Sequence, residues 1–259
     1  MPIPELVPRR GGVLQPRTPP WSGRASESSP ASEAASCIHY DKELAAPGGG
    51  GEHGPERDSS VEIHRGSAEL YDASTACFRH YRWWAVELLR LRPGEVVVDV
   101  GCGTGLCFPL IEERIGRQGR LIGIERCPEM LSRAASRVEA HRWGNVTLLH
   151  EPAEEARLPV ACDAALFCAT HDILRSPIAL KNVLGQLRPG GRAVAIGGKW
   201  APPWMPALNI AVFALHWPWA RTFEAFERPW SHMEQLVGDL QVETLAFGAG
   251  FVAWGIPRP

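Results

Sequence analysis

Apolar positions along the chain follow two different periods. Between residues 70 and 91 they recur at helical spacing, which predicts one amphipathic helix. After Arg92-Pro93-Gly94, short continuous apolar runs alternate with helical patterns. The runs predict strands at 95–100, 120–125, 145–151, 162–167 and 191–197, and the patterns between them predict helices near 106–115, 128–140 and 174–187.

Strands that are apolar on both faces and alternate with helices are typical of a parallel sheet covered by helices. The end of the chain differs. The apolar runs at 242–248 and 251–256 are joined by only two or three residues, which predicts an antiparallel hairpin at the sheet edge. The expected fold class is therefore α/β, with a mostly parallel sheet that ends in a C-terminal hairpin.

The first quarter of the chain has a different composition. Residues 1–66 are rich in Pro, Gly and Ser and lack sustained apolar periodicity, so they cannot bury enough surface to offset chain entropy. We expect a disordered tail there and one domain over 67–259. A second possibility is that the natural chain starts nearer Val61, which amino-terminal sequencing of the native protein would decide.

Charge and cysteine usage narrow the function classes. Lys and Arg number 27 against 29 Asp and Glu, so the chain has no broad basic surface for nucleic acid. Seven cysteines without a CxxC pair indicate reduced thiols. The chain has no apolar run long enough to span a bilayer and no secretory signal at its start. These features predict a soluble cytoplasmic protein without a metal site.

The most specific motif is VVVDVGCGTGLC at 96–107. A buried strand carries Asp99 and leads into a glycine-rich turn, where a ligand can approach the backbone closely at the carboxyl end of the sheet. The dinucleotide fingerprint G-x-G-x-x-G is not met, because the sixth position from Gly101 is Leu106. Nicotinamide and flavin cofactors are therefore disfavoured.

This motif resembles the first motif of class I S-adenosylmethionine-dependent methyltransferases, and residues 70–256 follow their element order. The most similar subgroup contains the ubiquinone and menaquinone methyltransferases. The resemblance implies a doubly wound, Rossmann-like, seven-stranded sheet and S-adenosyl-L-methionine as cofactor. It implies that Asp99 and the turn hold the methionine part, that Glu125 accepts both ribose hydroxyls, and that Arg126 and Met130 pack around adenine. The turn residues are Gly101, Cys102, Gly103, Thr104 and Gly105.

One position departs from the family pattern. After the third strand the family usually has an acidic residue followed by Ala, whereas this chain has Glu151-Pro152-Ala153. The resemblance leaves two contacts for the adenine amino group, the Glu151 carboxylate or the backbone at Ala153. Cys168, at the end of the fourth strand, completes the expected cofactor contacts.

A base is needed only for a neutral hydroxyl, phenol or carbon acceptor, and it must lie near the end of the fourth strand. His171 stands there and has a suitable ordinary pKa, so it is the candidate catalytic residue and also a candidate wall of the acceptor pocket. In the alternative, Asp172 caps the helix at 174–187 and His171 is only a wall.

Five of the ten Trp residues fall within 200–230, inside an insertion at about 198–240 that forms part of a substrate lid in this fold. The stretch 207–220 predicts a lid helix, and aromatic walls suit an apolar acceptor. The alternative is that these Trp residues pack the helix on the sheet or form a homodimer contact. The candidate acceptor contacts are Tyr71, Tyr81, Trp84, Trp200 and Trp204, together with His171.

The sequence thus favours methyl transfer to a small lipophilic or aromatic molecule of quinone, polyketide, terpenoid or lipid type. The alternative is a cofactor-binding protein of the same fold that has lost methyl transfer or performs another reaction such as cyclisation. The charge balance and the lack of an added recognition domain disfavour an RNA or protein acceptor.

Overall fold

The computed structural model describes residues 7–8, 14–15, 71–218, 220 and 222–258. The expected tail lies outside the described residues, apart from the paired short strands β1 (Val7–Pro8) and β2 (Leu14–Gln15). The division into a tail and one domain at residue 66 therefore stays a prediction. In the described part of the chain, no helix combines the length and the apolar character needed to cross a membrane.

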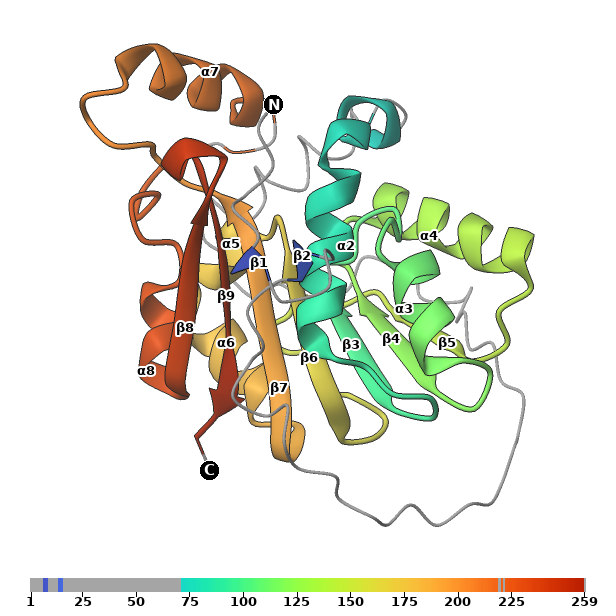
Figure 1. Cartoon of the computed structure of the whole chain (residues 1–259). Helices are drawn as coiled ribbons and strands as arrows, with labels where there is room; N and C mark the ends of the chain where they lie inside the picture. Colours follow the sequence, from blue (N-terminus) through green and yellow to red (C-terminus); the bar gives the residue numbers. More distant parts are fainter. Residues whose placement is uncertain (1–6, 9–13, 16–70, 219, 221, 259) are drawn as a thin grey trace, which may run out of the picture.

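The main sheet has seven strands in the order β5-β4-β3-β6-β7-β9-β8 (Figure 1). The first five in this order are parallel, β9 runs antiparallel to β7, and β8 pairs antiparallel with β9. This confirms the predicted α/β fold with its C-terminal hairpin. The strands are β3 (Val96–Val100), β4 (Arg120–Ile124), β5 (Val146–Leu149), β6 (Cys162–Cys168), β7 (Leu187–Gly198), β8 (Val237–Leu245) and β9 (Gly250–Pro257).

Helices cover both faces of this sheet (Figure 1). Apolar side chains of α2, α3 and α4 pack in one core cluster, and those of α6 and α8 pack in a second cluster on the opposite face. The helical elements are η1 (Ala76–Phe78), α2 (Arg79–Leu89), α3 (Phe108–Ile115), α4 (Pro128–His141), α5 (His171–Leu174), α6 (Pro177–Leu184), α7 (Pro206–His216), α8 (Ser231–Leu236) and η2 (Ala246–Gly248).

The alternation of side chains along β3 decides where the strand's one carboxylate points. Val98 and Val100 belong to the core cluster under α6, whereas Val97 belongs to the cluster under α2. Because successive side chains of a strand face opposite sides, Asp99 shares the face of Val97. Asp99 is therefore directed towards α2, with only 1% of its surface exposed.

Three details differ from the sequence expectations. The helix expected over 70–91 is interrupted, because the hydroxyls of Ser74 and Thr75 both donate to the carbonyl of Tyr71 and compete with the helical ladder. The alternative that Asp172 caps the next long helix is wrong, since Ser176 accepts from Ala179 N at the start of α6. The first strand of the hairpin begins at Val237, five residues before the predicted start.

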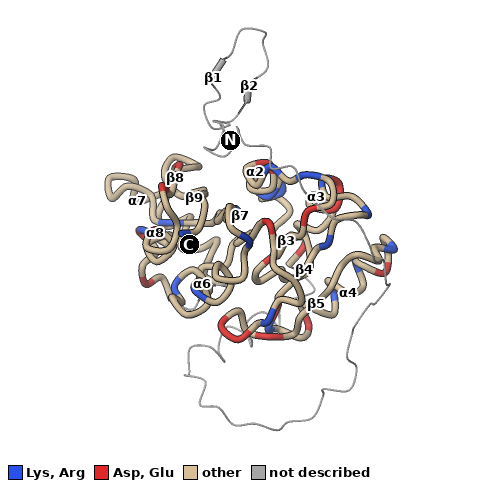
Figure 2. Tube along the Cα trace, turned by 90° about the horizontal axis from the view of Figure 1, so that it is seen from below, with Lys and Arg blue, Asp and Glu red and all other residues tan. Residues whose placement is uncertain are grey.

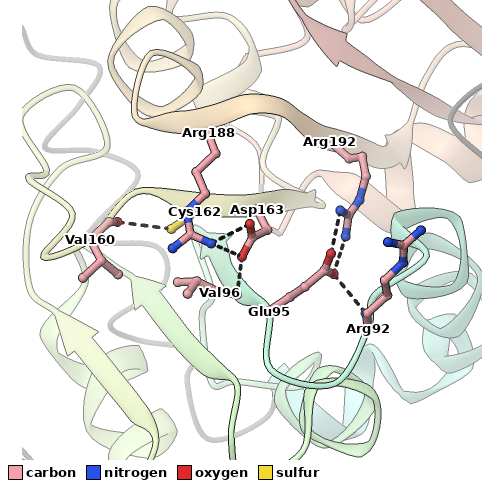
Figure 3. Close-up of polar contacts among 8 residues, drawn as sticks. All are labelled: Arg92, Glu95, Val96, Val160, Cys162, Asp163, Arg188 and Arg192. Carbon is pink, nitrogen blue, oxygen red and sulfur yellow. Dashed lines mark hydrogen bonds and ion pairs between the residues drawn. The ribbon is translucent and has the colours of Figure 1, made fainter. Parts of the chain in front are cut away.

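Ion pairs join the strands at their amino-terminal ends, opposite the glycine turn (Figure 3). Glu95, just before β3, receives two hydrogen bonds from Arg192 of β7, at 2.9 and 2.5 Å. Asp163 of β6 accepts from Arg188 at 2.7 and 2.8 Å and from Val96 N at 2.8 Å. Charge-assisted contacts between strands far apart in sequence stabilise this edge of the sheet.

We expect Glu95→Gln to lower the free energy of unfolding by about 2 kcal/mol, because Arg192 would lose a two-point partner in a largely buried setting. Chemical denaturation measures this change. The matched control is Glu234→Gln, whose ion pair with Arg228 is exposed and should contribute little. Equal losses in the two variants would contradict the role of the buried pair.

Candidate functional site

The turn between β3 and α3 depends on glycine. Gly101, Gly103 and Gly105 have φ values of +67°, +56° and +76°, in the region that side chains disfavour. A Cβ at Gly101 would lie 2.6 Å from Cγ2 of Thr170, and one at Gly105 would lie 2.7 Å from the ring of Phe108. At Gly103 the nearest atom is Met130 Cε at 3.7 Å, so the backbone there is open to close approach.

A small cavity lies beside this turn and contains charged groups. It encloses about 20 Å³, roughly one water molecule. Oδ2 of Asp99 is buried without a hydrogen-bond partner among the described residues. Burial, followed by the charge of Glu125, raises the pKa of Asp99 to about 7, although the charge of Arg82 opposes the rise. The lining residues are Tyr71, Arg82, Asp99, Gly101, Cys102, Leu106, Cys107, Cys168 and Ala169.

Arg82 was not anticipated as a site residue. It is 8% exposed, donates to Thr75 O at 3.0 Å and lines the cavity with Asp99. The sequence held a signal for it, because Arg82 occupies the apolar stripe of α2 at four- and seven-residue spacing from Val86 and Leu89. A charged residue on a buried stripe needs a polar partner and so marks a candidate site.

Glu125 follows β4 and holds the glycine turn by hydrogen bonds. Its Oε2 accepts from Gly103 N at 2.9 Å, and its Oε1 accepts from Cys127 N at 2.7 Å. Glu125 is thus tied to the glycine turn through both of its carboxylate oxygens.

The residues expected around adenine do not share contacts with one another. Met130 is 2% exposed and packs with Cys127 and Tyr71. The carbonyl of Arg126 contacts His150 Nε2 at 3.1 Å. Glu151 accepts from Arg157 N at 3.2 Å, so its carboxylate is engaged within its own loop.

The two residues after Glu151 lie between β5 and β6. Pro152 accepts from the backbone N–H groups of Glu155 and Ala156, which closes a turn. Ala153 is buried and its carbonyl accepts from Asn182 of α6 at 2.9 Å. The loop is therefore held to the helix that follows β6.

Asp72 holds the segment before α2 against the glycine turn. Its Oδ1 accepts from the Thr104 hydroxyl at 2.5 Å, and its Oδ2 pairs with Arg137 of α4 at 2.6 Å. Arg137 also donates to Thr104 O at 2.9 Å. The segment that carries Tyr71 over the cavity is thus anchored by three mutual contacts. A wider hollow of about 790 Å³ runs along α4 beyond this pair, lined mostly by exposed side chains.

His171 begins α5 and contacts the insertion after β7. Its Nε2 lies 3.1 Å from Glu224 O, and its ring packs edge-to-face on Phe226 at 4.9 Å. Since a carbonyl only accepts, Nε2 carries the proton and Nδ1 is an acceptor. Nδ1 is buried and has no partner among the described residues. Burial, followed by the charge of Arg175, lowers the pKa of His171 to about 4, so the ring is neutral at pH 7.

The expected aromatic contacts separate into different groups. Trp200 packs on Phe223 at 5.1 Å and on Phe226 at 5.4 Å, beside His171. Trp204, in contrast, is 80% exposed.

The aromatic residues of α2 lie elsewhere. Trp84 is buried in the core cluster, and Tyr81 packs against that cluster. Neither is among the residues that line the small cavity. Tyr71 does line it, and burial raises the pKa of its hydroxyl well above the ordinary range, so the group stays protonated.

Comparison with known proteins gives a family match over the same elements. Residues 97–191, from β3 into β7, match the family described as a methyltransferase domain. A demethylmenaquinone methyltransferase of Bacillus cereus is 29% identical over 138 residues, which cover 50% of this chain and 57% of that protein. A protein-L-isoaspartate O-methyltransferase of Ignicoccus hospitalis is 35% identical over 112 residues, with coverage of 43% and 51%. The chain spans about half the length of these relatives.

The fold is also similar to that of solved structures. Phosphoethanolamine N-methyltransferase 2 of Haemonchus contortus, solved in complex with S-adenosyl-L-methionine, aligns with a TM-score of 0.50 at 16% identity. The alignment covers 64% of this chain and 38% of that one. Residues 97–191 of this chain are thus similar to a methyltransferase domain.

The residues at this site fit S-adenosyl-L-methionine, the cofactor that the sequence resemblance implies. The buried Asp99 oxygen, which has no partner among the described residues, suits a positively charged amino group, and the open backbone at Gly103 suits close approach of a ligand. Small-molecule pockets usually take roughly 300–1,000 Å³, so the whole cofactor needs space beyond the small cavity of about 20 Å³.

The raised pKa of Asp99 predicts a trade-off between stability and binding. Ionised Asp99 destabilises the fold, so its contribution to stability declines as the pH rises from about 4 through about 7. We expect Asp99→Asn to raise the free energy of unfolding at pH 8 by ~2 kcal/mol and to weaken cofactor binding at least about tenfold. Thermal melting across pH and calorimetric titration measure the two effects.

The matched control is Asp239→Asn at an exposed position of β8, which should change neither quantity. In the unmodified protein, cofactor affinity should increase with pH through about 7, because only ionised Asp99 attracts an ammonium group. A pH-independent affinity would contradict this role.

Proposed function

We propose that the protein transfers the methyl group of S-adenosyl-L-methionine to a small lipophilic or aromatic acceptor. The observation that carries the proposal is the position of an aromatic cluster around Phe226 beside His171, which follows β6 at the same end of the sheet as the glycine turn. In open α/β sheets this end binds the ligands.

The methionine part of the cofactor has two charged partners in this proposal. Asp99 binds the amino group, and Arg82 binds the carboxylate, since both line the same cavity with opposite charges. Tyr71 closes this end with a neutral hydroxyl. Opposite charges buried side by side match a zwitterion better than they match an uncharged ligand.

The rest of the cofactor extends along the turn towards β4 and β5. Glu125, which is held beside the turn by Gly103 N, accepts from the ribose hydroxyls, as the sequence resemblance implies. Met130 and Arg126 pack near adenine. Glu151 accepts from Arg157 N, and the carbonyls of Pro152 and Ala153 also accept from neighbouring groups, so the Glu151 carboxylate and the backbone at Ala153 both stay candidate contacts for adenine. Cys168, at the end of β6, lines the cavity that takes the methionine part.

When bound, the cofactor supplies a methyl group on a positively charged sulfur, which reacts by direct displacement once the acceptor is aligned and water is excluded. The chain's task is therefore mainly to enclose the acceptor. Trp200, Phe223 and Phe226 supply an apolar wall for this, and the insertion at about 198–240 acts as the lid. The contacts support Trp200 more than Trp204, Tyr81 or Trp84 as acceptor contacts.

Nδ1 of His171 accepts a hydrogen bond from the hydroxyl group of the molecule that is to be methylated. Its Nε2–H is held by Glu224 O, which leaves Nδ1 as the basic atom. The lowered pKa of about 4 keeps the ring neutral and ready to take a proton across the physiological range. It also makes His171 a weaker base than an ordinary histidine.

The decisive test is an acceptor screen with cofactor that carries a labelled methyl group. We expect label to appear on an apolar or aromatic acceptor, detected by mass, and not on polar acceptors of similar size. Cofactor binding without label transfer to any acceptor would favour a binding or repurposed protein of the same fold. Methylation of polar acceptors alone would contradict the apolar wall.

We expect His171→Ala to lower turnover at least about tenfold, because the basic Nδ1 would be missing from the pocket of the methyl acceptor. Cofactor affinity should be retained, because His171 is not expected to contact the cofactor. His171→Gln keeps a donor for Glu224 O without a base and should show the same loss. The rate of the unmodified enzyme should show no inflection from His171 between pH 6 and 8, given its lowered pKa. Near-normal turnover in His171→Gln would leave only a structural role.

A further inference from the structure

Helix α7 is apolar on the side that faces solvent. Residues 200–220 contain no Asp, Glu, Lys or Arg. The helix has two polar residues, and both are directed inward. Asn209 exchanges hydrogen bonds with the backbone of Ala201 at 2.8 and 3.2 Å, and His216 packs edge-to-face on Phe226 at 5.2 Å.

The same inward face includes Val212, which is 4% exposed and lies three residues after Asn209 and four before His216. The adjoining face, one residue further round the helix, carries Ile210, Phe213 and Trp217, with 71%, 43% and 58% of their surfaces exposed, and the inner edge of Phe213 stacks on Phe223. This outward face, Ile210, Phe213 and Trp217, inverts the usual arrangement of a surface helix, whose polar side faces water.

The position of α7 leaves this face accessible. Figure 1 shows the helix beyond the ends of the strands, apart from the helices that cover the sheet. In Figure 2 its tube carries neither blue nor red, in contrast to the neighbouring segments. Trp204 before the helix and Trp217 after it place an indole at each end, and Trp204 is 80% exposed.

A lipid bilayer matches this face better than a second copy of the chain. Eleven residues make a helix about 16 Å long, whose outward half offers roughly 300 Å². A stable protein interface needs roughly 800 Å² from each partner. An interfacial membrane helix needs only an apolar face that enters the boundary between headgroups and acyl chains, and indoles favour that boundary. The helix is too short to cross the bilayer.

The lack of charged residues in and beside the helix also indicates which kind of lipid surface it fits. Without a cation in 200–220, the helix has nothing that selects an anionic surface, so a zwitterionic bilayer is sufficient. We propose that the outward face of α7 docks this protein on the surface of a lipid bilayer, with Ile210, Phe213 and Trp217 inserted at the headgroup boundary. Docking is independent of methyl transfer, and if the proposed function holds, it indicates an acceptor that resides in the membrane.

The test is flotation of the full chain with phosphatidylcholine vesicles, without cofactor or acceptor. We expect the protein to float with the vesicles, and to do so equally at about 0.1 M and about 0.5 M salt. The double variant Ile210→Asn, Phe213→Asn should need at least about tenfold more lipid for half-binding, since two apolar side chains would no longer enter the bilayer.

The matched control is Ile178→Asn on α6, an apolar residue of similar exposure at 62% outside the outward face, which should bind like the unmodified chain. Failure of the unmodified chain to float, or equal binding by the double variant, would overturn the proposal. A dimer that dissociates in the double variant, without vesicle binding, would assign the face to a second copy. Because no methyl transfer is measured, these outcomes leave the proposed function to its own test.

Discussion

Two glycines of the turn after β3 occupy positions where a side chain would collide with the rest of the protein. A Cβ at Gly101 would meet Thr170 at 2.6 Å, and one at Gly105 would meet Phe108 at 2.7 Å. The tight packing brings the end of β6 and the start of α3 against the turn. It also aligns Gly103 N with Glu125, so the ends of three strands meet at one place. The ligand site depends on this close approach of the turn backbone to the neighbouring side chains.

The charges at this site lie where they oppose the stability of the fold. Asp99 is buried with an oxygen that has no described partner, and Arg82 is buried on a helix stripe that is otherwise apolar. A buried charge is costly unless a partner compensates it. Functional sites commonly retain such groups, because the partner is the ligand itself.

The aromatic cluster links this site to the outer surface of the molecule. Phe226 contacts His171 on one side and His216 of α7 on another, and the second contact is part of the inward face of that helix. The inward face is therefore occupied by the protein's own residues, while the outward face exposes apolar side chains. An acceptor bound against the cluster would lie close to the part of the protein that we assign to the membrane.

Local pattern and element order were sufficient to predict much of this protein. The glycine turn, the five parallel strands, the final hairpin and the position of Glu125 at a strand end all follow from short-range periodicity and turn chemistry. Such features depend on residues within a few positions of one another. Element boundaries were less accurate, because the Ser74 and Thr75 hydroxyls and the Ser176 cap act through single hydrogen bonds that periodicity does not register.

Tertiary structure decided which distant side chains meet. Arg82 lines a cavity with Asp99 only because α2 packs on the face of β3 to which Asp99 points. His171 has its basic atom at Nδ1 because Glu224, more than fifty residues away, accepts from Nε2. The apolar character of α7 is visible in the sequence, but which face turns outward depends on the packing of Val212 and His216. Contacts between distant residues arise from three-dimensional packing, which local periodicity does not determine.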